Sequence, residues 1–228
     1  MATGEGPDAL LYVSTTKEVW TMNHRAGTIT CVDASSLEVK ATIEVGGALE
    51  FAQEYVAKGM VFVNSEDKNF VAQIDAKKHS VVARHELAPA TTPTGLAIDE
   101  KNGILFAGCD QKLAILDAST GKVIATPEIG KGCDAVAFDA ERMLAFASCG
   151  DGTTTVVHEA DPKKFDVVAK IETAKGAKTC ALDPKTHKLW LAASTRGQDD
   201  ARLLVFAQEE RAAEGAKEKD KGKEKDKK

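Results

Sequence analysis

Residues 113–129 read LAILDASTGKVIATPEI: an alternating apolar segment, Asp117, a short polar turn and a second apolar segment. Alternation with a period of two is typical of half-buried β-strands, and a Ser/Thr/Gly turn between two such segments is typical of a β-hairpin. Asp117 could be a catalytic carboxylate. It could equally stabilise the turn by accepting hydrogen bonds from backbone N–H groups two residues further along.

The same hairpin pattern occurs four times at a constant spacing. Residues 27–45 (GTITCVDASSLEVKATIEV), 69–87 (NFVAQIDAKKHSVVARHEL) and 153–172 (TTTVVHEADPKKFDVVAKIE) repeat the arrangement of residues 113–129. The acidic residue recurs every 42 residues, as Asp33, Asp75, Asp117 and Glu159. Because it recurs with the hairpin, we interpret this residue as a turn marker rather than a catalytic group.

A second feature repeats five times and extends the period to the whole chain. Short apolar runs begin at residues spaced by 42, 44, 40 and 44 positions: Asp8, Glu50, Thr94, Asp134 and Lys178. An aromatic residue follows each start by twelve positions: Trp20, Phe62, Phe106, Phe146 and Trp190. Aromatic side chains in an apolar strand pack between neighbouring units, so we expect these five in the core rather than on a base-stacking surface.

Each unit contains four short strand patterns; in the third unit they are GLAID, ILFAGC, KLAILD and VIATPEI. Four antiparallel strands repeated every 40–45 residues predict an all-β fold, a β-propeller of five blades. The expected propeller spans residues 1–207, with a charged, Lys-rich, disordered tail after it at 208–228. The expected blades are residues 8–46, 50–90, 94–130, 134–174 and 178–207.

The segments PTGLAIDEKNGILFAG and LAILDASTGKVIATPEIGKGCDAVAFD resemble the YVTN-type repeats of YncE-like proteins, which are related to seven-bladed lactonase-like propellers. The resemblance covers about residues 6–207. It implies a propeller that lacks the first two blades of a seven-bladed ancestor. It also implies a periplasmic or secreted home, although the first residues carry no signal-peptide pattern.

The fifth unit turns charged after ARLLVFA (201–207), so we expect its blade to lack a fourth strand. The result would be an open or truncated propeller with an exposed strand edge. Exposed edges pair readily with other strands. Self-association through open blade edges is therefore one expected form of partnership, beside an unknown small molecule or protein.

Propeller topology places the five unit starts around the mouth of the central channel, where loops from all blades converge. The ligand-binding candidates are therefore the unit starts together with residues of the neighbouring loops: Asp8, Glu50, Thr94, Asp134, Lys178, Asn23, Asp67, Asp110, Asp151 and Arg196. A ring of carboxylates could hold Ca²⁺, but no loop has calcium-binding spacing, so neither a metal nor a cofactor is predicted. A hydrated polar channel mouth is the simpler interpretation.

Three functions are compatible with this fold. The favoured one is a non-catalytic binding or interaction module. A sugar-lactone hydrolase is the alternative, and His24 and Arg25 are then the catalytic candidates, as a proton shuttle and an anion-holding group. No GxSxG motif is present. Nucleic-acid binding is weaker: the last twelve residues carry +3, which leaves −8 for the rest of a chain with net charge −5.

The five cysteines form no CxxC pair and no Cys/His cluster along the sequence, so there is no zinc signature and we expect free thiols. Cys109 and Cys149 occupy matching positions of adjacent units, where a disulfide would need Cα atoms within about 7 Å. The chain contains no apolar run of membrane-spanning length, and no membrane span is expected.

Overall fold

The computed structural model describes residues 2–194 and 200–208 of the 228-residue chain. In this part of the chain, nineteen strands form five antiparallel sheets, and the only helical segment is a single 3-10 turn, Val56–Lys58. None of the described residues form a helix long and apolar enough to cross a membrane. The all-β propeller expected from the repeats is confirmed.

Four sheets have four strands in chain order. The first comprises β1 (Pro7–Val13), β2 (Glu18–Asn23), β3 (Thr28–Asp33) and β4 (Val39–Glu44). The second comprises β5 (Leu49–Tyr55), β6 (Met60–Ser65), β7 (Phe70–Asp75) and β8 (Ser80–Glu86). The third comprises β9 (Leu96–Asp99), β10 (Ile104–Cys109), β11 (Lys112–Asp117) and β12 (Val123–Ala125). The fourth comprises β13 (Cys133–Asp139), β14 (Leu144–Cys149), β15 (Thr153–Asp161) and β16 (Lys164–Glu172).

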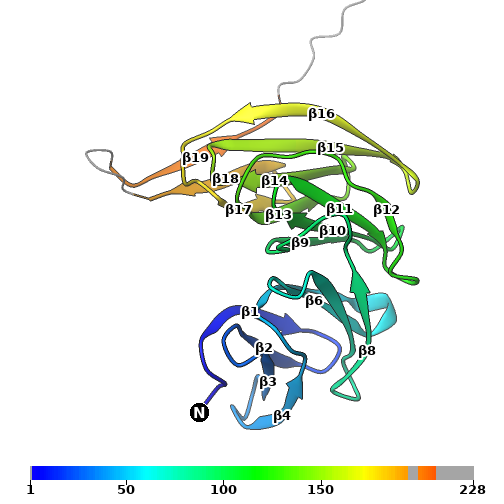
Figure 1. The fold of residues 1–228 in the computed structure, drawn as a ribbon. Coiled ribbons are helices and arrows are strands. Elements are labelled where there is room, and N and C mark those ends of the chain that lie inside the picture. Colours follow the sequence, from blue (N-terminus) through cyan, green and yellow to red (C-terminus); the bar gives the residue numbers. More distant parts are fainter. Residues whose placement is uncertain (1, 195–199, 209–228) are drawn as a thin grey trace, which may run out of the picture.

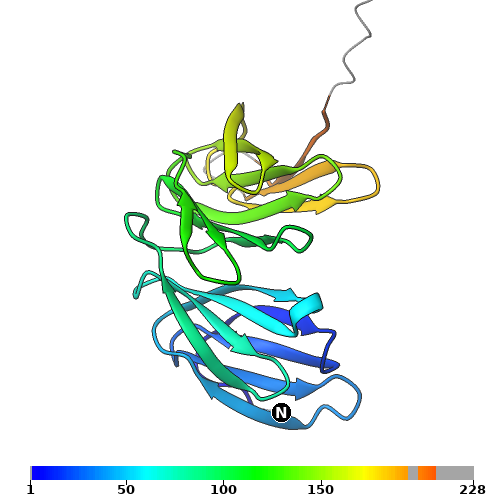
Figure 2. The same ribbon diagram turned by 90° about the vertical axis from the view of Figure 1, so that its right-hand side faces the viewer.

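The fifth sheet has three strands within the described residues: β17 (Thr179–Asp183), β18 (Lys188–Ala193) and β19 (Arg202–Phe206). The blades follow one another along an arc, from the first blade at one end to the fifth at the other (Figures 1 and 2). Each inner strand contacts the next, from β1 through β5, β9 and β13 to β17. Over the described part of the chain, β17 and β1 share no comparable contact, so the arc is open between the last blade and the first.

Three of the five aromatic residues of the second strands are in the core between blades, as predicted, whereas Phe146 and Trp190 are only partly buried. Trp20, Phe62 and Phe106 have no exposed surface. Phe106 stacks on Phe138 of the next blade, with the ring centroids 5.0 Å apart. Burying an aromatic side chain of this size contributes about 1.5–3 kcal/mol, so these rings hold neighbouring blades together.

The acidic turn markers divide into two kinds. The carboxylate of Asp117 accepts hydrogen bonds from the backbone N–H groups of Ser119 and Thr120, both at 2.9 Å, as the hairpin pattern predicts. The prediction that Glu159 marks a turn in the same way is wrong. Its side chain is only 2% exposed and lies inside β15, which continues to Asp161. A register shift follows Glu159, and Asp161 accepts the turn hydrogen bond from the Lys163 N–H at 2.8 Å instead.

Candidate functional site

The five unit starts lie together at one end of the inner strands. Asp8, Glu50, Thr94, Asp134 and Lys178 all line one hollow of about 540 Å³. The hollow is also lined by Glu66, which the sequence analysis did not single out. Glu66 directly precedes Asp67, which the sequence places among the mouth candidates, but its charge alone does not distinguish it from the neighbouring carboxylates.

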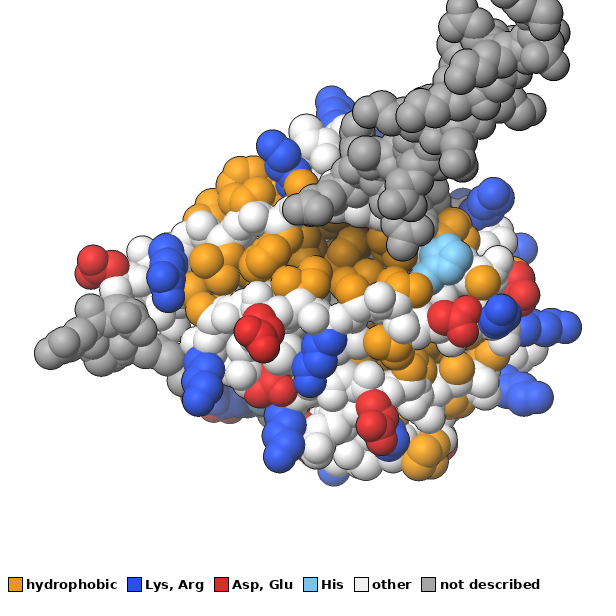
Figure 3. All heavy atoms as spheres, turned by 90° about the horizontal axis from the view of Figure 1, so that it is seen from above, with side chains coloured by type: hydrophobic (Ala, Val, Ile, Leu, Met, Phe, Trp, Pro, Cys, Tyr) orange, Lys and Arg blue, Asp and Glu red, His pale blue; other side chains and the backbone are white. Residues whose placement is uncertain are grey.

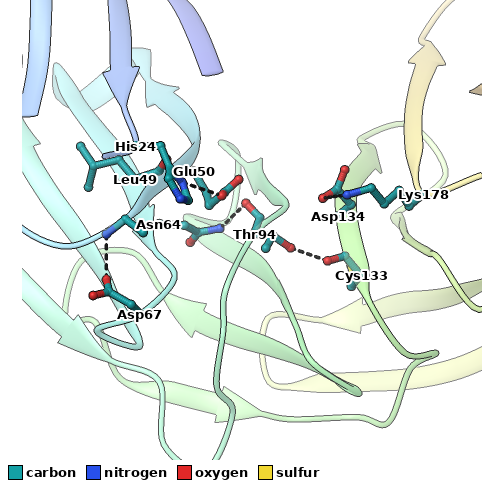
Figure 4. A network of polar contacts seen from close by, with 10 residues as sticks. His24, Leu49, Glu50, Asn64, Asp67, Thr94, Cys133, Asp134 and Lys178 are labelled. Atoms are coloured by element: carbon teal, nitrogen blue, oxygen red, sulfur yellow. Dashed lines mark hydrogen bonds and ion pairs between the residues drawn. The ribbon is translucent and has the colours of Figure 1, made fainter. Parts of the chain in front are cut away.

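Two side-chain contacts, one of them an ion pair, organise this channel mouth (Figure 4). Lys178 Nζ lies 2.9 Å from Asp134 Oδ1, which joins the fourth and fifth blades. His24 Nδ1 lies 3.0 Å from Glu50 Oε1 and 3.3 Å from the Leu49 carbonyl oxygen, which joins the first and second blades. The carboxylate of Asp134 raises the pKa of Lys178, so this amine stays charged beside its partner.

Glu50 is the most perturbed carboxyl group of the mouth. Burial raises its pKa to about 7, and the negative charges of Asp8 and Glu66 act in the same direction. His24 opposes the shift through its positive charge when protonated. A carboxyl group with a pKa near neutrality can exchange a proton at physiological pH, which makes Glu50 the mouth residue best suited to acid–base chemistry.

Thr94 serves mainly to join blades. Its hydroxyl donates to the Cys133 carbonyl oxygen of the next blade, and its own carbonyl oxygen accepts a hydrogen bond from Asn64 Nδ2 at 2.8 Å. The side chain is therefore engaged on the wall of the hollow.

The two residues predicted as a catalytic pair separate in the structure. His24 turns to Glu50, whereas the Arg25 guanidinium lies 3.8 Å from Glu5 and its side chain is 73% exposed. Arg25 does not line the mouth hollow. The geometry therefore brings His24 together with two carboxyl groups, those of Glu50 and Asp8, without the expected Arg.

Asn23 is not a mouth residue. Its side chain is fully buried, and its amide nitrogen donates to Thr28 Oγ1 at 3.0 Å and Thr30 Oγ1 at 2.9 Å. Its amide oxygen accepts from Thr21 Oγ1 at 3.1 Å. All of these partners belong to the first blade, so Asn23 holds the β2–β3 hairpin together.

Three loop carboxylates bind backbone N–H groups of the connecting segments. Asp67 accepts from Ala48 at 2.7 Å, Asp110 from Gly132 at 3.5 Å, and Asp151 from Lys131 at 2.9 Å. These contacts fix the loops beside the mouth to the interblade connections. The remaining candidate, Arg196, lies outside the described residues.

A second candidate site lies between the fourth and fifth blades. A groove of about 670 Å³ runs along β14, β15 and β16 on one side and β18 and β19 on the other. Figure 3 looks onto this face and shows apolar side chains gathered in a hollow. The apolar side chains that line it include Phe146, Val156, Val168, Leu189 and Phe206.

No family model and no curated protein matches the chain. Among solved structures, a chain of Kuenenia stuttgartiensis hydrazine synthase is similar, with a TM-score of 0.72 and 13% sequence identity; the match covers 84% of this chain and 56% of that one. A chain of a mitotic checkpoint complex is similar with a TM-score of 0.72 and 14% identity, over 82% of this chain and 60% of that one. The present chain thus spans somewhat over half the length of each. At these identities the likeness shows the β-propeller fold alone.

Proposed function

We propose that this chain is a non-catalytic protein-interaction module of the YncE-like kind, whose fifth blade, three-stranded within the described residues, takes a strand from a partner protein. The observation that carries the proposal is the apolar groove beside β19, where the other four blades have a fourth strand. The YVTN-like segments of the repeats support the family assignment.

The edge of the fifth blade has the chemistry of a strand acceptor. Leu203 and Val205 of β19 are 61% and 45% exposed, and Val168 of β16 is 54% exposed on the far wall of the groove. An edge strand offers unpaired backbone N–H and C=O groups to an added strand. Peptide recognition by strand addition combines such backbone hydrogen bonds with pockets for alternate side chains.

The other blades indicate which segment would fit. Their outer strands include VKATIE in β4, SVVARHE in β8 and KFDVVAKIE in β16, in which aliphatic and charged side chains are interspersed. In β8, half-buried and exposed positions alternate over the last five residues. The partner is therefore an extended segment that places branched aliphatic side chains in the groove and charged ones in water.

The test uses a labelled peptide with the sequence of residues 164–172 and measures its binding to the full chain by fluorescence anisotropy. Val168→Asp should weaken binding by at least about tenfold, because an unpaired carboxylate in an apolar groove is costly. Val167→Asp is the matched control: Val167 is 50% exposed on the same strand but does not line the groove. Equal weakening by the two variants, or no saturable binding, contradicts the proposal.

Two further arms identify the occupant. A chain that ends at Gln208 should bind the peptide equally, which excludes electrostatic capture by the Lys-rich residues 209–228. Light scattering after size-exclusion chromatography reports self-association. A dimer that Val168→Asp dissociates would assign the groove to a second copy and would overturn the assignment to a different protein.

The lactone-hydrolase alternative has one supporting contact, the His24–Glu50 pair in the mouth. Stabilising the anion of a tetrahedral intermediate also requires donors aimed at it. Arg25, the expected donor, instead lies next to the carboxylate of Glu5. We therefore favour the interaction module.

A further inference from the structure

The seam between the first and second blades contains a thiol, an imidazole and a carboxylate in one cluster. Glu18 is on β2, Cys31 is on β3, and His79 is in the β7–β8 turn of the second blade. Their ligand atoms all lie within 4.8 Å of one another. Glu18 and Cys31 are 5% and 0% exposed, and the His79 side chain is 23% exposed. The cluster is therefore built inside the protein, with access from the His79 side.

The internal repeats provide a control for how unusual this cluster is. The positions equivalent to Glu18 in the next three blades are apolar: Met60, Ile104 and Leu144. The position of Cys31, opposite the second-strand aromatic, is held by Gln73, Ile115 and Val156. Packing at this place in a blade does not require a carboxylate or a thiol. Only the first blade, with its neighbour's His79, combines the three groups among the described seams.

The local hydrogen bonds position the carboxylate and the imidazole but leave the thiol free. Glu18 Oε2 accepts from Trp20 Nε1 at 2.8 Å and from Thr16 Oγ1 at 3.1 Å, and it lies 2.8 Å from His79 Nε2. The other buried cysteines, such as Cys109 and Cys149, direct their thiols to backbone carbonyl oxygens. Cys31 makes no such hydrogen bond within the described residues, although its sulfur lies beside the carboxylate and the imidazole.

We propose that Glu18, Cys31 and His79 form a binding site for a zinc-class divalent metal ion that joins the first two blades. Cys thiolate, His nitrogen and carboxylate oxygen are the three ligand types that Zn²⁺ uses in proteins, and three protein ligands leave a fourth position for water. A thiolate and an imidazole together favour such an ion over Mg²⁺ or Ca²⁺, which prefer oxygen ligands only. This site is separate from the groove of the proposed function.

Binding involves a defined change in protonation. The ion bonds to Cys31 Sγ, and the thiol proton leaves to solvent; the His79 nitrogen must likewise be unprotonated where it bonds the ion. Around an ion with metal–ligand distances of about 2.0–2.3 Å, the His79 and Glu18 ligand atoms move slightly apart from their present 2.8 Å. The His79 turn supplies this freedom, since it is the more exposed partner.

Trp20 is a built-in reporter for this site, because its ring centroid lies 5.9 Å from that of His79. The chain has two tryptophans, so a Trp190→Phe background leaves Trp20 as the single emitter. Phe is present at the equivalent position of three other blades, as in Phe106. Titration of this full-length protein with Co²⁺ should quench Trp20 fluorescence and produce a thiolate-to-cobalt absorption band, both saturating at one ion per chain.

The variants identify the ligands. Cys31→Val should remove the absorption band, and His79→Gln should weaken Co²⁺ binding by at least about 100-fold, the upper end of the loss caused by outer-shell changes. Val occupies the equivalent core position as Val156, so Cys31→Val has a precedent within the fold. Cys133→Ala and Glu50→Gln should leave the band unchanged; they control for the other buried thiols and for the Asp8–His24–Glu50 group, which also brings three ligand atoms within 4.8 Å.

The proposal is overturned if wild-type protein shows no saturable quenching, or if the band survives Cys31→Val. Loss of the band in Cys133→Ala would overturn it as well, by placing the metal on another thiol. Thermal unfolding gives an independent readout: Zn²⁺ should raise the Tm of wild type and leave that of Cys31→Val unchanged. Because wild-type binding and quenching are measured first, the outcome does not depend on the folding of any variant.

Discussion

The carboxyl groups of Asp99, on β9, and Glu159, on β15, interact across the seam between the third and fourth blades. They are 1% and 2% exposed, and Asp99 Oδ2 and Glu159 Oε2 have no hydrogen-bond partner among the described residues. Asn102 Nδ2 donates to the other Glu159 oxygen at 2.9 Å. A proton on Glu159 would let the two side chains share one hydrogen bond, whereas two buried charged carboxylates repel each other.

This relationship predicts that Glu159 makes the protein less stable as pH rises. Burial first, and then Asp99, raises the pKa of Glu159 from 4.5 to about 7. The folded state therefore holds a proton that the unfolded chain releases above about pH 4.5. The stabilisation is fully present below pH 4.5 and is lost as pH rises through 7, by up to on the order of 3 kcal/mol.

Glu159→Gln tests this, because a Gln amide donates to Asp99 at every pH. Relative to wild type, the variant should gain unfolding free energy between pH 5 and pH 8, as measured by urea denaturation. Glu172 is an exposed carboxyl group on the same sheet, and Glu172→Gln should show the same pH dependence of unfolding free energy as wild type. A wild-type-minus-variant difference that stays flat with pH would show that the Asp99–Glu159 pair does not hold a proton.

Phe106→Ala is predicted to destabilise the protein by about 3–5 kcal/mol, because it removes a fully buried ring that stacks on Phe138. Urea denaturation measures the loss. Tyr12→Ala is the control, since Tyr12 is 53% exposed on β1 and should cost far less. Equal small effects would mean that the second-strand aromatic does not hold the blades together.

Much of this architecture is predictable because the repeat is visible in the residues themselves. The spacing of Asp8, Glu50, Thr94, Asp134 and Lys178 predicts that they meet, since every inner strand starts at the same end of its blade. The spacing cannot say which side chains pair, so the separation of His24 from Arg25 came only from the structure. The same limit applies to Asn23, whose Thr28 and Thr30 partners depend on strand register.

Features that depart from the repeat could not be predicted from the sequence either. The fixed 42-residue spacing placed Glu159 with Asp117, but a register shift in β15 moves the turn contact to Asp161. Cys31 and His79 are 48 positions apart in the sequence, beyond any zinc-motif spacing, and only packing of the first blade on the second brings them together. The periodicity of the sequence predicts features that recur in every blade. It does not predict tertiary contacts between positions that are not equivalent in the repeat.

The proposed interaction module predicts no turnover of five- or six-membered sugar lactones at pH 7–8. The mouth has an acid–base group in Glu50, but Arg25 lies on Glu5, away from the hollow. Proton release in a pH-stat measures hydrolysis directly. Turnover by wild type that both His24→Ala and Glu50→Gln abolish would instead establish catalysis at the mouth. Arg25→Ala is the accompanying control, with no effect expected.

Carboxylates that accept hydrogen bonds from the backbone N–H groups of a turn should contribute to the free energy of unfolding, whereas carboxylates that only occupy the equivalent sequence position should not. Asp117→Ala should cost about 1 kcal/mol at pH 7, since it removes charge-assisted hydrogen bonds to two backbone N–H groups at a partly exposed site. The hydrogen bonds from Ser119 and Thr120 lower the pKa of Asp117. Its contribution is therefore present above the unfolded pKa of 3.8 and is lost as pH falls through the lower folded value.

In the fourth blade, we expect Asp161 rather than Glu159 to stabilise the turn. Asp161→Ala removes the acceptor of the Lys163 N–H and should destabilise in the same direction as Asp117→Ala. Asp166→Ala, an exposed mid-strand carboxylate on β16, is the matched control and should change unfolding free energy little. Urea denaturation at pH 7 and pH 3 measures all three variants. If Asp161→Ala changed the free energy of unfolding as little as Asp166→Ala does, Asp161 would not stabilise this turn. The role predicted for Glu159 from the 42-residue spacing would then have to be tested again.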